Sequence, residues 1–222
     1  MKPLDVQKLL RDRILEHRFL NLWQRNLLPR VRCDSDQAWE KLRRRYGEEH
    51  RHYHDLGHLA HCLDQLDLAR ESVDHPDQVE MAIWYHDVIN EPDGRENERL
   101  SANYFASEAH DCIAAGFIGR VVELILVTTH KHAPANNDQR FICDIDLASF
   151  GCPWECFVHD SDAVKAEFVG SDEEYYRGKS TFLRSMLDRP RIFRTDFFYA
   201  RYEQQSRQNI ERLLQLVETE KD

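Results

Sequence analysis

The densest group of chemically active side chains is the segment RHYHDLGHLAH, residues 51–61, which holds four histidines. Imidazole nitrogens bind transition metals and exchange protons near neutral pH. If a helix starts in this segment, His54 and His58 are four residues apart and share one face, a spacing that suits metal chelation. The same spacing also occurs on ordinary helix surfaces, so this segment alone does not show whether the two histidines bind a metal or are surface residues.

Two more segments place carboxylates among apolar residues. AIWYHDVIN contains His86 and Asp87, and FICDIDLASFG contains Asp144 and Asp146. Adjacent helix positions are only about 100° apart, so His86 and Asp87 can reach one ion. A buried carboxylate is costly unless a positive charge compensates it, although Asp144 could instead cap a helix. We expect His58, His86, Asp87 and Asp146 to surround one divalent ion, with Asp144 as the reserve ligand.

This donor set also indicates a reaction. Two imidazoles and two carboxylates suit Mn, Fe, Co, Ni or Zn better than Mg. Such an ion can activate water at neutral pH and neutralise charge on a phosphoryl group. His54, whose unperturbed pKa is about 6.5, can protonate a leaving alkoxide. The residues therefore predict metal-assisted hydrolysis of a phosphoester.

Taken together, the segments resemble the HD superfamily of metal-dependent phosphohydrolases, whose motif has the order H…HD…D. The resemblance to one family of predicted HD phosphohydrolases covers nearly the whole chain. Its matching pieces are Arg51-His52-Tyr53-His54 with His58, His86-Asp87, Asn97-Glu98-Arg99-Leu100-Ser101-Ala102, Thr128 or Thr129 with His130 and His132, and Asp144-Ile145-Asp146-Leu147-Ala148. It implies an HD-type helical bundle that acts on a small phosphorylated metabolite.

A second resemblance assigns roles to two of the histidines. YHDLGH is similar in spacing to the Y-H-N-x-x-H segment of cyclic-nucleotide phosphodiesterases, in which the second histidine binds metal and the first donates a proton. This implies that His58 is a ligand and that His54 is the general acid. Asp55 replaces the asparagine, and the chain lacks a glutamine-containing segment to hold a purine. A nucleotide or another phosphomonoester is therefore expected, rather than a cyclic nucleotide.

Two further residues are candidates for catalysis. Glu98 could hydrogen-bond a metal-bound water or complete a second metal site, but a simple helix N-terminal charge explains it equally well. His130 closes a predicted helix and could line the site, and His132 is a weaker candidate. A protonated histidine at a helix C-terminus is also favourable without any function.

Three cationic residues are candidates for holding substrate phosphate. Arg51 lies three residues before His54, close to the same helix face, although it could be an ordinary surface arginine. AVKAEF and YYRGKSTFLRSML stand where the resembling family tends to have I-R-x-E-Y and G-R, so Lys165 and Lys179 replace its arginines. Lysine keeps the charge of arginine but lacks its bidentate fork.

The elements that must position these residues are predicted to be helices. Glycine and proline are scarce, with 8 and 7 residues, and no hairpin signal separates alternating strands. Apolar residues recur with helical spacing. We expect one all-α domain over residues 1–222, with helices near 4–28, 36–47, 56–73, 77–89, 96–114, 117–130, 139–149, 154–168, 172–188 and 196–219.

Composition limits the partners and the compartment. The net charge of −10 argues against binding to a nucleic-acid polymer or a membrane surface. No apolar run approaches the ~20 residues of a membrane span, and the charged N-terminus resembles no signal peptide. We therefore expect a cytoplasmic protein whose six cysteines are free thiols. Cys152 and Cys156 are interpreted as small core residues rather than as zinc ligands.

Two alternatives to a phosphohydrolase stay open. An HD-type diiron oxygenase would need more ligands, which only His130, His132 and Glu98 could supply. A binding or sensing module could keep the metal as a structural element without activity. The intact H…HD…D set favours an enzyme. The sequence leaves the substrate, the metal and the oligomeric state undetermined.

Overall fold

The computed structural model describes the backbone of residues 3–92 and 94–219. Within these residues the chain forms α-helices and short 3-10 helices and no strand, which confirms the all-α prediction. The elements are α1 (Pro3–Arg25), α2 (Ser35–Tyr46), α3 (Leu56–Ala69), η1 (Arg70–Ser72), α4 (Pro76–Tyr85), α5 (Asn97–Ala109), α6 (Ala115–Val127), α7 (Asn137–Asp146), η2 (Ala148–Gly151), α8 (Trp154–Ala166), α9 (Asp172–Leu187) and α10 (Asp196–Thr219).

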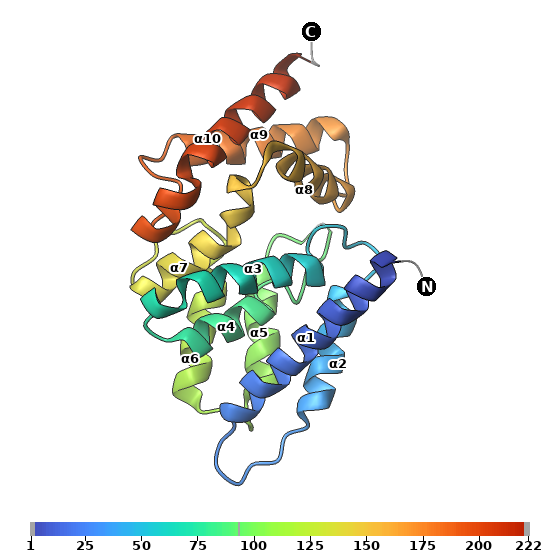
Figure 1. Cartoon of the computed structure of the whole chain (residues 1–222), viewed down its shortest axis with the longest axis vertical. Coiled ribbons are helices and arrows are strands. Elements are labelled where there is room, and N and C mark those ends of the chain that lie inside the picture. The colour runs from blue at the N-terminus through green and yellow to red at the C-terminus, as the bar shows by residue number, and fades with distance from the viewer. Residues whose placement is uncertain (1–2, 93, 220–222) are drawn as a thin grey trace.

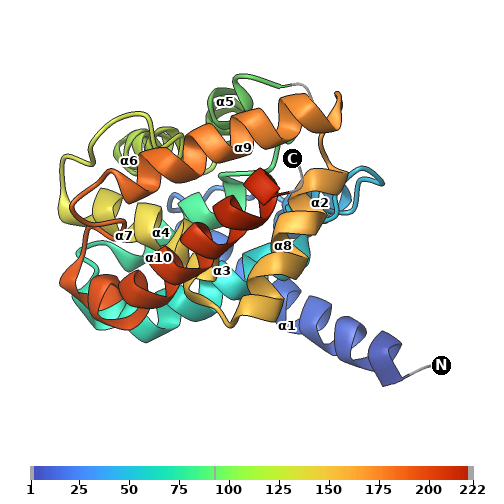
Figure 2. The same cartoon turned by 90° about the horizontal axis from the view of Figure 1, so that it is seen from above.

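The helices form two groups that share one hydrophobic core. Helices α1 to α7 make up the larger group, and α8, α9 and α10 lie together at one end of the molecule (Figure 1). Seen from above, these three helices form a layer over the rest (Figure 2). The buried core is continuous from Leu15 in α1 to Leu214 in α10. The short η2 segment joins the groups, since α10 packs closely against it.

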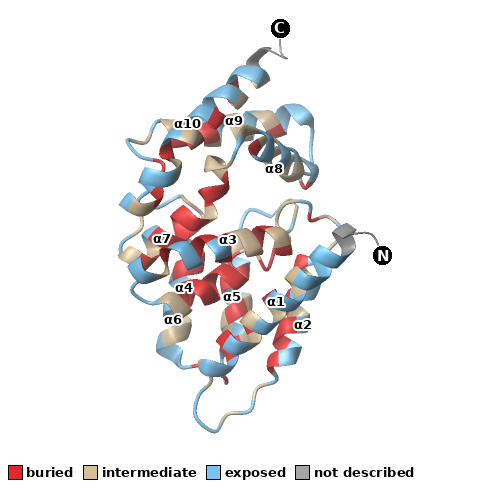
Figure 3. Cartoon of the chain, in the orientation of Figure 1, coloured by how far each residue is buried: buried red, intermediate tan, exposed pale blue. Residues whose placement is uncertain are grey.

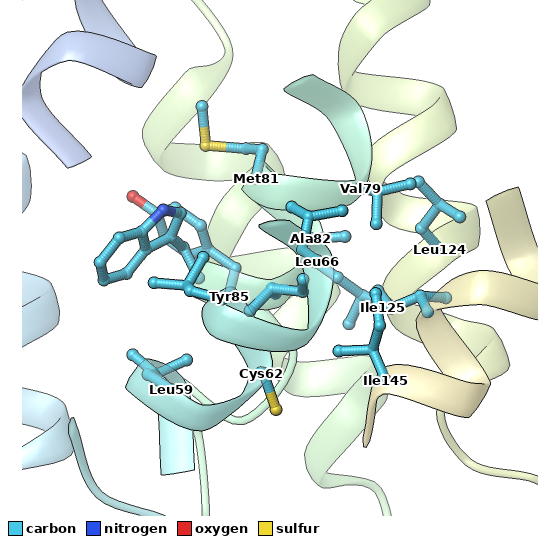
Figure 4. Close-up of a cluster of buried hydrophobic side chains, with 14 of the residues drawn as sticks. Leu59, Cys62, Leu66, Val79, Met81, Ala82, Tyr85, Leu124, Ile125 and Ile145 are labelled. Atoms are coloured by element: carbon cyan, nitrogen blue, oxygen red, sulfur yellow. The ribbon is translucent and has the colours of Figure 1, made fainter. Parts of the chain in front are cut away.

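Helix α4 lies at the centre of the larger group. Every residue from Gln78 to Tyr85 is buried, and a helix that is apolar on nearly all sides must be surrounded by others. Figure 4 shows its Val79, Met81 and Tyr85 among side chains of α3, α6 and α7. Figure 3 shows that buried residues concentrate in the same region. The end of α4 is therefore fixed firmly in the core.

Several helices end earlier than the sequence predicts, and the differences matter for the site. The helix expected over 77–89 ends at Tyr85, so His86 and Asp87 lie in the turn that follows it. The helix expected over 117–130 ends at Val127, and His130 adopts a left-handed φ of 54° beyond it. Asp146 is the last residue of α7. The candidate residues His86 and Asp87, His130, and Asp146 therefore each lie at, or just after, the C-terminus of a helix.

The prediction that all six cysteines are free is wrong. Cys33, in the connection between α1 and α2, forms a disulfide with Cys112, just after α5. The amide of Leu28 also donates to the carbonyl of Cys112 over 2.8 Å. The bond joins residues 79 positions apart, a pairing that sequence spacing does not reveal. Cys62, Cys143, Cys152 and Cys156 are free. In the described chain, no helix combines the length and apolarity needed to cross a bilayer.

Candidate metal centre

The four predicted ligands converge on one point. One ligand atom from each of His58, His86, Asp87 and Asp146 lies within 4.8 Å of the others. Nε2 of His86 lies 3.0 Å from Oδ2 of Asp87 and 3.4 Å from Oδ1 of Asp146. Nε2 of His58 lies 3.7 Å and 3.5 Å from the same two oxygens. This group could hold a metal ion, as the sequence predicts.

The two imidazoles are oriented for ligation. Nδ1 of His86 donates to the carbonyl of Ile83 over 2.8 Å, so in the neutral ring the proton is on Nδ1 and Nε2 has a lone pair available for a metal. This lone pair faces Nε2 of His58, only 3.3 Å away. Two ring nitrogens that face each other beside two carboxylates fit a shared cation between them. The residues present therefore fit the expected metal.

The electrostatics of these four residues also favour binding of a cation. Burial opposes the charged form of Asp87, but the charges of His86 and His54 hold its pKa well below the ordinary range. Burial likewise opposes ionisation of Asp146, yet hydrogen bonds from His130, His58 and His86 keep its pKa low. The C-termini of α4 and α7 add partial negative charge. Ionised carboxylates beside two helix C-termini make a strongly cation-binding environment.

Asp144 is not a ligand of this group. Its carboxylate accepts the backbone N–H groups of Arg194 and Thr195 and the Thr195 hydroxyl, each over 2.7 Å. These contacts fasten the loop that precedes α10. Of the two aspartates considered from sequence, only Asp146 points toward His58 and His86.

His130 lies next to the four ligands. Its Nε2 is 2.8 Å from Oδ2 of Asp146, the oxygen other than the one nearest the two histidines. A hydrogen bond of this kind orients a ligating carboxylate. The left-handed backbone at His130 turns the chain after α6 so that the ring reaches Asp146. The structure thus brings His130 to the site, as the sequence predicts.

His54 is held by a glutamate that the sequence analysis did not single out. Glu167 accepts hydrogen bonds from Nδ1 of His54 over 2.5 Å and from the backbone N–H groups of His52, Tyr53 and His54. The opposite nitrogen, Nε2 of His54, lies 4.0 Å from Oδ2 of Asp87. One ring nitrogen is therefore fixed by Glu167 while the other faces the metal ligands.

Charge reinforces this arrangement. Although burial alone would lower the pKa of His54, the negative charges of Asp87 and Glu167 raise it above the ordinary value. Burial would raise the pKa of Glu167, but its hydrogen bond to His54 and the positive charge there lower it to about 2. The only sequence signal for Glu167 was its place in AVKAEF, opposite the glutamate of I-R-x-E-Y. In that segment the search for cations selected Lys165 instead.

The structure does not place Arg51 on the open surface of the site, where the sequence predicts a contact with substrate phosphate. Its side chain has no exposed area, because the guanidinium donates to the carbonyls of His54, Asp87 and Val88 at 2.7–3.0 Å. It also bonds Glu48 and stacks on the ring of Tyr46. Through these hydrogen bonds Arg51 instead connects the segment before α3 to the turn after α4.

The two lysines predicted to hold phosphate differ in their positions relative to a pocket. A pocket of about 380 Å³ opens beside Asp146, His130 and His54, and Lys179 forms part of its wall. Lys165 does not line that pocket, and its ammonium group bonds Asp172 and Tyr176 at 3.0 and 3.1 Å. A phosphate contact by Lys165 stays a prediction.

Glu98 lies in the first turn of α5. It belongs neither to the four-residue group nor to the pocket wall, so a catalytic role for it stays a prediction.

Comparison of the chain with protein-family models, with curated proteins and with solved structures finds no match. The function must therefore be inferred from the residues of the site and their geometry.

Proposed function

We propose that the protein is a metal-dependent phosphohydrolase that cleaves a small phosphomonoester. The observation that carries this proposal is the convergence of His58, His86, Asp87 and Asp146 at the end of a pocket. When bound there, a divalent ion would act as a Lewis acid that lowers the pKa of water and neutralises phosphoryl charge. The described residues contain one such ligand group, which favours a one-ion phosphohydrolase over a diiron oxygenase.

His54 supplies the proton for the leaving group in this proposal. Glu167 occupies Nδ1 of His54 and favours the imidazolium form, so Nε2 carries a proton toward the pocket. Because the segment from His52 to His54 is hydrogen-bonded to the same carboxylate, the ring has a fixed orientation. A pre-oriented acid beside the metal ligands is what cleavage of an unactivated phosphoester requires.

Lys179 supplies a positive charge away from the metal. Burial lowers the pKa of its ammonium group to about 8, so the group is still largely protonated at neutral pH. A lysine in a pocket wall can hold the phosphate oxygens that do not react. The proposal is supported by the position of Lys179 in the pocket wall, which Arg51 and Lys165 do not line.

A phosphatase screen tests the proposal. The purified 222-residue chain is first treated with a chelator and then supplied separately with Mn, Co, Ni, Zn or Mg. Nucleotides, sugar phosphates and 4-nitrophenyl phosphate are offered with each ion. We expect metal-dependent phosphate release that is lost in a His86→Ala variant. Absence of hydrolysis with every ion, although metal binds stoichiometrically, would instead support a metal-binding module.

A further inference from the structure

Five phenylalanine and tyrosine rings line the pocket beside the candidate metal centre. Its lining comes from the segment before α3, from η2 and its flanks, and from α8 and α9. The apolar and aromatic residues that the argument uses are Tyr53, Leu147, Phe150, Phe168, Tyr175 and Phe182. Phe150 and Phe182 meet edge to face, and the rings of Phe168 and Tyr175 are 5.5 Å apart. Such walls can pack around a ring or a branched hydrocarbon.

The polar groups of these walls already have partners. The Tyr53 hydroxyl bonds Ser149 over 2.9 Å, and the Tyr175 hydroxyl donates to the carbonyl of Ser161. The carboxylate of Glu174 accepts both the amide and the hydroxyl of Ser171 as part of a capping box. Hydroxyl-rich sugars and base edges need free donors and acceptors, so these walls suit neither.

Lys179 differs from these polar groups. Within the described part of the chain its ammonium group forms no ion pair within 4.0 Å, although the negative charge of Asp160 acts on it from a longer distance, and the residue is half-buried in the wall. It is positioned to meet an anion that arrives with the ligand. The pocket thus combines the candidate metal centre and one cation with walls in which the tyrosine hydroxyls and the Glu174 carboxylate already bond other protein groups and the remaining surface is largely apolar.

A glycine leaves space at one wall. Glu174, Tyr175, Gly178, Lys179 and Phe182 follow one face of α9 along the pocket. A Cβ atom built on Gly178 would meet nothing within 4 Å. The pocket can therefore be narrowed at this position without a clash in the protein.

We propose that this pocket binds an apolar leaving group, so that the substrate is a monophosphate ester of a small aromatic or branched aliphatic alcohol. This rests on the proposed function, because the phosphate is assigned to the metal centre and Lys179. The ester oxygen then lies near His54, and the apolar group lies between Phe150, Phe168 and Phe182. The class excludes sugar phosphates and nucleotides as preferred substrates.

Alcohol leaving groups of similar basicity but different polarity test this inference. With the metal-loaded chain, kcat/KM should be roughly tenfold to hundredfold higher for benzyl phosphate than for glycerol phosphate or adenosine monophosphate. Isopentenyl phosphate distinguishes a branched aliphatic preference from an aromatic one. Equal or better hydrolysis of glycerol phosphate or the nucleotide would overturn the inference but not the proposed function. No hydrolysis of any ester, including 4-nitrophenyl phosphate, would overturn the proposed function.

A binding measurement separates recognition from turnover. Calorimetric titration should show benzylphosphonate binding roughly tenfold more tightly than methylphosphonate. Equal affinities would overturn the inference even if phosphatase activity were present.

Two leucine substitutions provide a matched pair. Gly178→Leu fills space at the pocket, whereas Gly119→Leu adds the same side chain to α6, where a Cβ also meets nothing within 4 Å. Leucine favours a helix more than glycine does, so both variants should fold. The measured quantity is the ratio of kcat/KM for the bulky 2-naphthylmethyl phosphate to kcat/KM for the small acetyl phosphate. Gly178→Leu should lower this ratio roughly tenfold relative to the wild type, while Gly119→Leu should leave it unchanged. Equal ratios in the two variants would contradict the assigned pocket.

Discussion

His54 and His58 are four residues apart, yet their surroundings give them different chemistry. His58 is buried in the first turn of α3 and faces His86 across 3.3 Å. His54 lies before the helix, where Glu167 holds one of its nitrogens. The first environment suits a metal ligand, and the second suits a proton donor.

Substitution of each histidine should separate these roles. His58→Ala removes one of the four proposed ligands and should lose metal. His54→Ala should retain metal but lose roughly 10²–10⁴ in rate on alkyl phosphates, with a much smaller loss on an aryl phosphate that needs no proton. Metal analysis together with kcat for both substrate types checks this. Loss of metal in His54→Ala would make His54 a ligand rather than an acid.

Lys179 should impose a pH dependence on substrate binding. Because burial lowers its pKa to about 8, the charge that attracts phosphate is present below that pH and is lost as the pH rises through it. KM should therefore increase above pH ~8, by roughly tenfold once the lysine is neutral. Measurement of KM between pH 6.5 and 9.5 at constant metal content checks this.

Lys179→Arg is the matched control, because arginine stays charged over this range. Its KM should be flat with pH, whereas Lys179→Met should have a high KM throughout. A rise in KM above pH ~8 that persists in both variants would mean that another group causes it.

At the scale of elements, the ligand types were predictable and their exact positions were not. Charged residues inside apolar runs identified His86, Asp87 and Asp146, since burial of such groups requires compensation. Helix periodicity, however, carried the helices past residues 85, 127 and 146, where they end. These ends place the ligands in turns and at negative helix termini, which apolar spacing alone cannot reveal.

Long-range contacts were the other limit on prediction. Glu167 meets His54 from 113 residues away, and Arg51 meets Asp87 and Val88 through their carbonyl oxygens. Backbone acceptors leave no signal in the residue types of a sequence. An arginine three residues before the proposed general acid therefore suggested a phosphate contact, although its guanidinium bonds carbonyl groups inside the protein.

The end of α7 and the start of α10 offer a test that distinguishes the two aspartates. Asp146→Asn should abolish tight metal binding. Asp144→Asn should keep metal but lower the free energy of unfolding by about 2–3 kcal/mol, because its new amide group would face N–H donors in the 194–195 loop. Metal titration and denaturant unfolding of both variants check this. Metal loss in Asp144→Asn without a change in stability would reverse the assignment.

At the scale of the whole molecule, the position of α8, α9 and α10 determines how His54 is held and which pocket lies beside the four proposed ligands. The larger helix group supplies His58, His86, Asp87 and Asp146, whereas the other group supplies Glu167, at the end of α8, and much of the pocket. The number and class of these helices could be predicted from apolar spacing. Their packing over the metal centre could not, because it depends on contacts between residues more than 100 positions apart.

The Cys33–Cys112 disulfide stabilises the molecule at a distance from this site. It attaches the α1–α2 connection, which Figure 1 shows at the opposite end from α8–α10, to the segment after α5. A cross-link over 79 residues removes chain entropy from the unfolded state worth about 4.5 kcal/mol, and measured effects are typically about 2–4 kcal/mol. Reduction should therefore weaken the fold without disturbing the ligands.

We expect dithiothreitol to lower the free energy of unfolding by about 2–4 kcal/mol. A Cys33→Ser/Cys112→Ser double variant should be destabilised to the same extent and should not respond further to the reductant. Denaturant unfolding with and without dithiothreitol, alongside metal analysis, checks both. An equal response of the wild type and the double variant would assign the effect to another cysteine. The double variant should bind as much metal as the wild type without reductant, and metal loss in it would show instead that the two ends of the molecule are coupled.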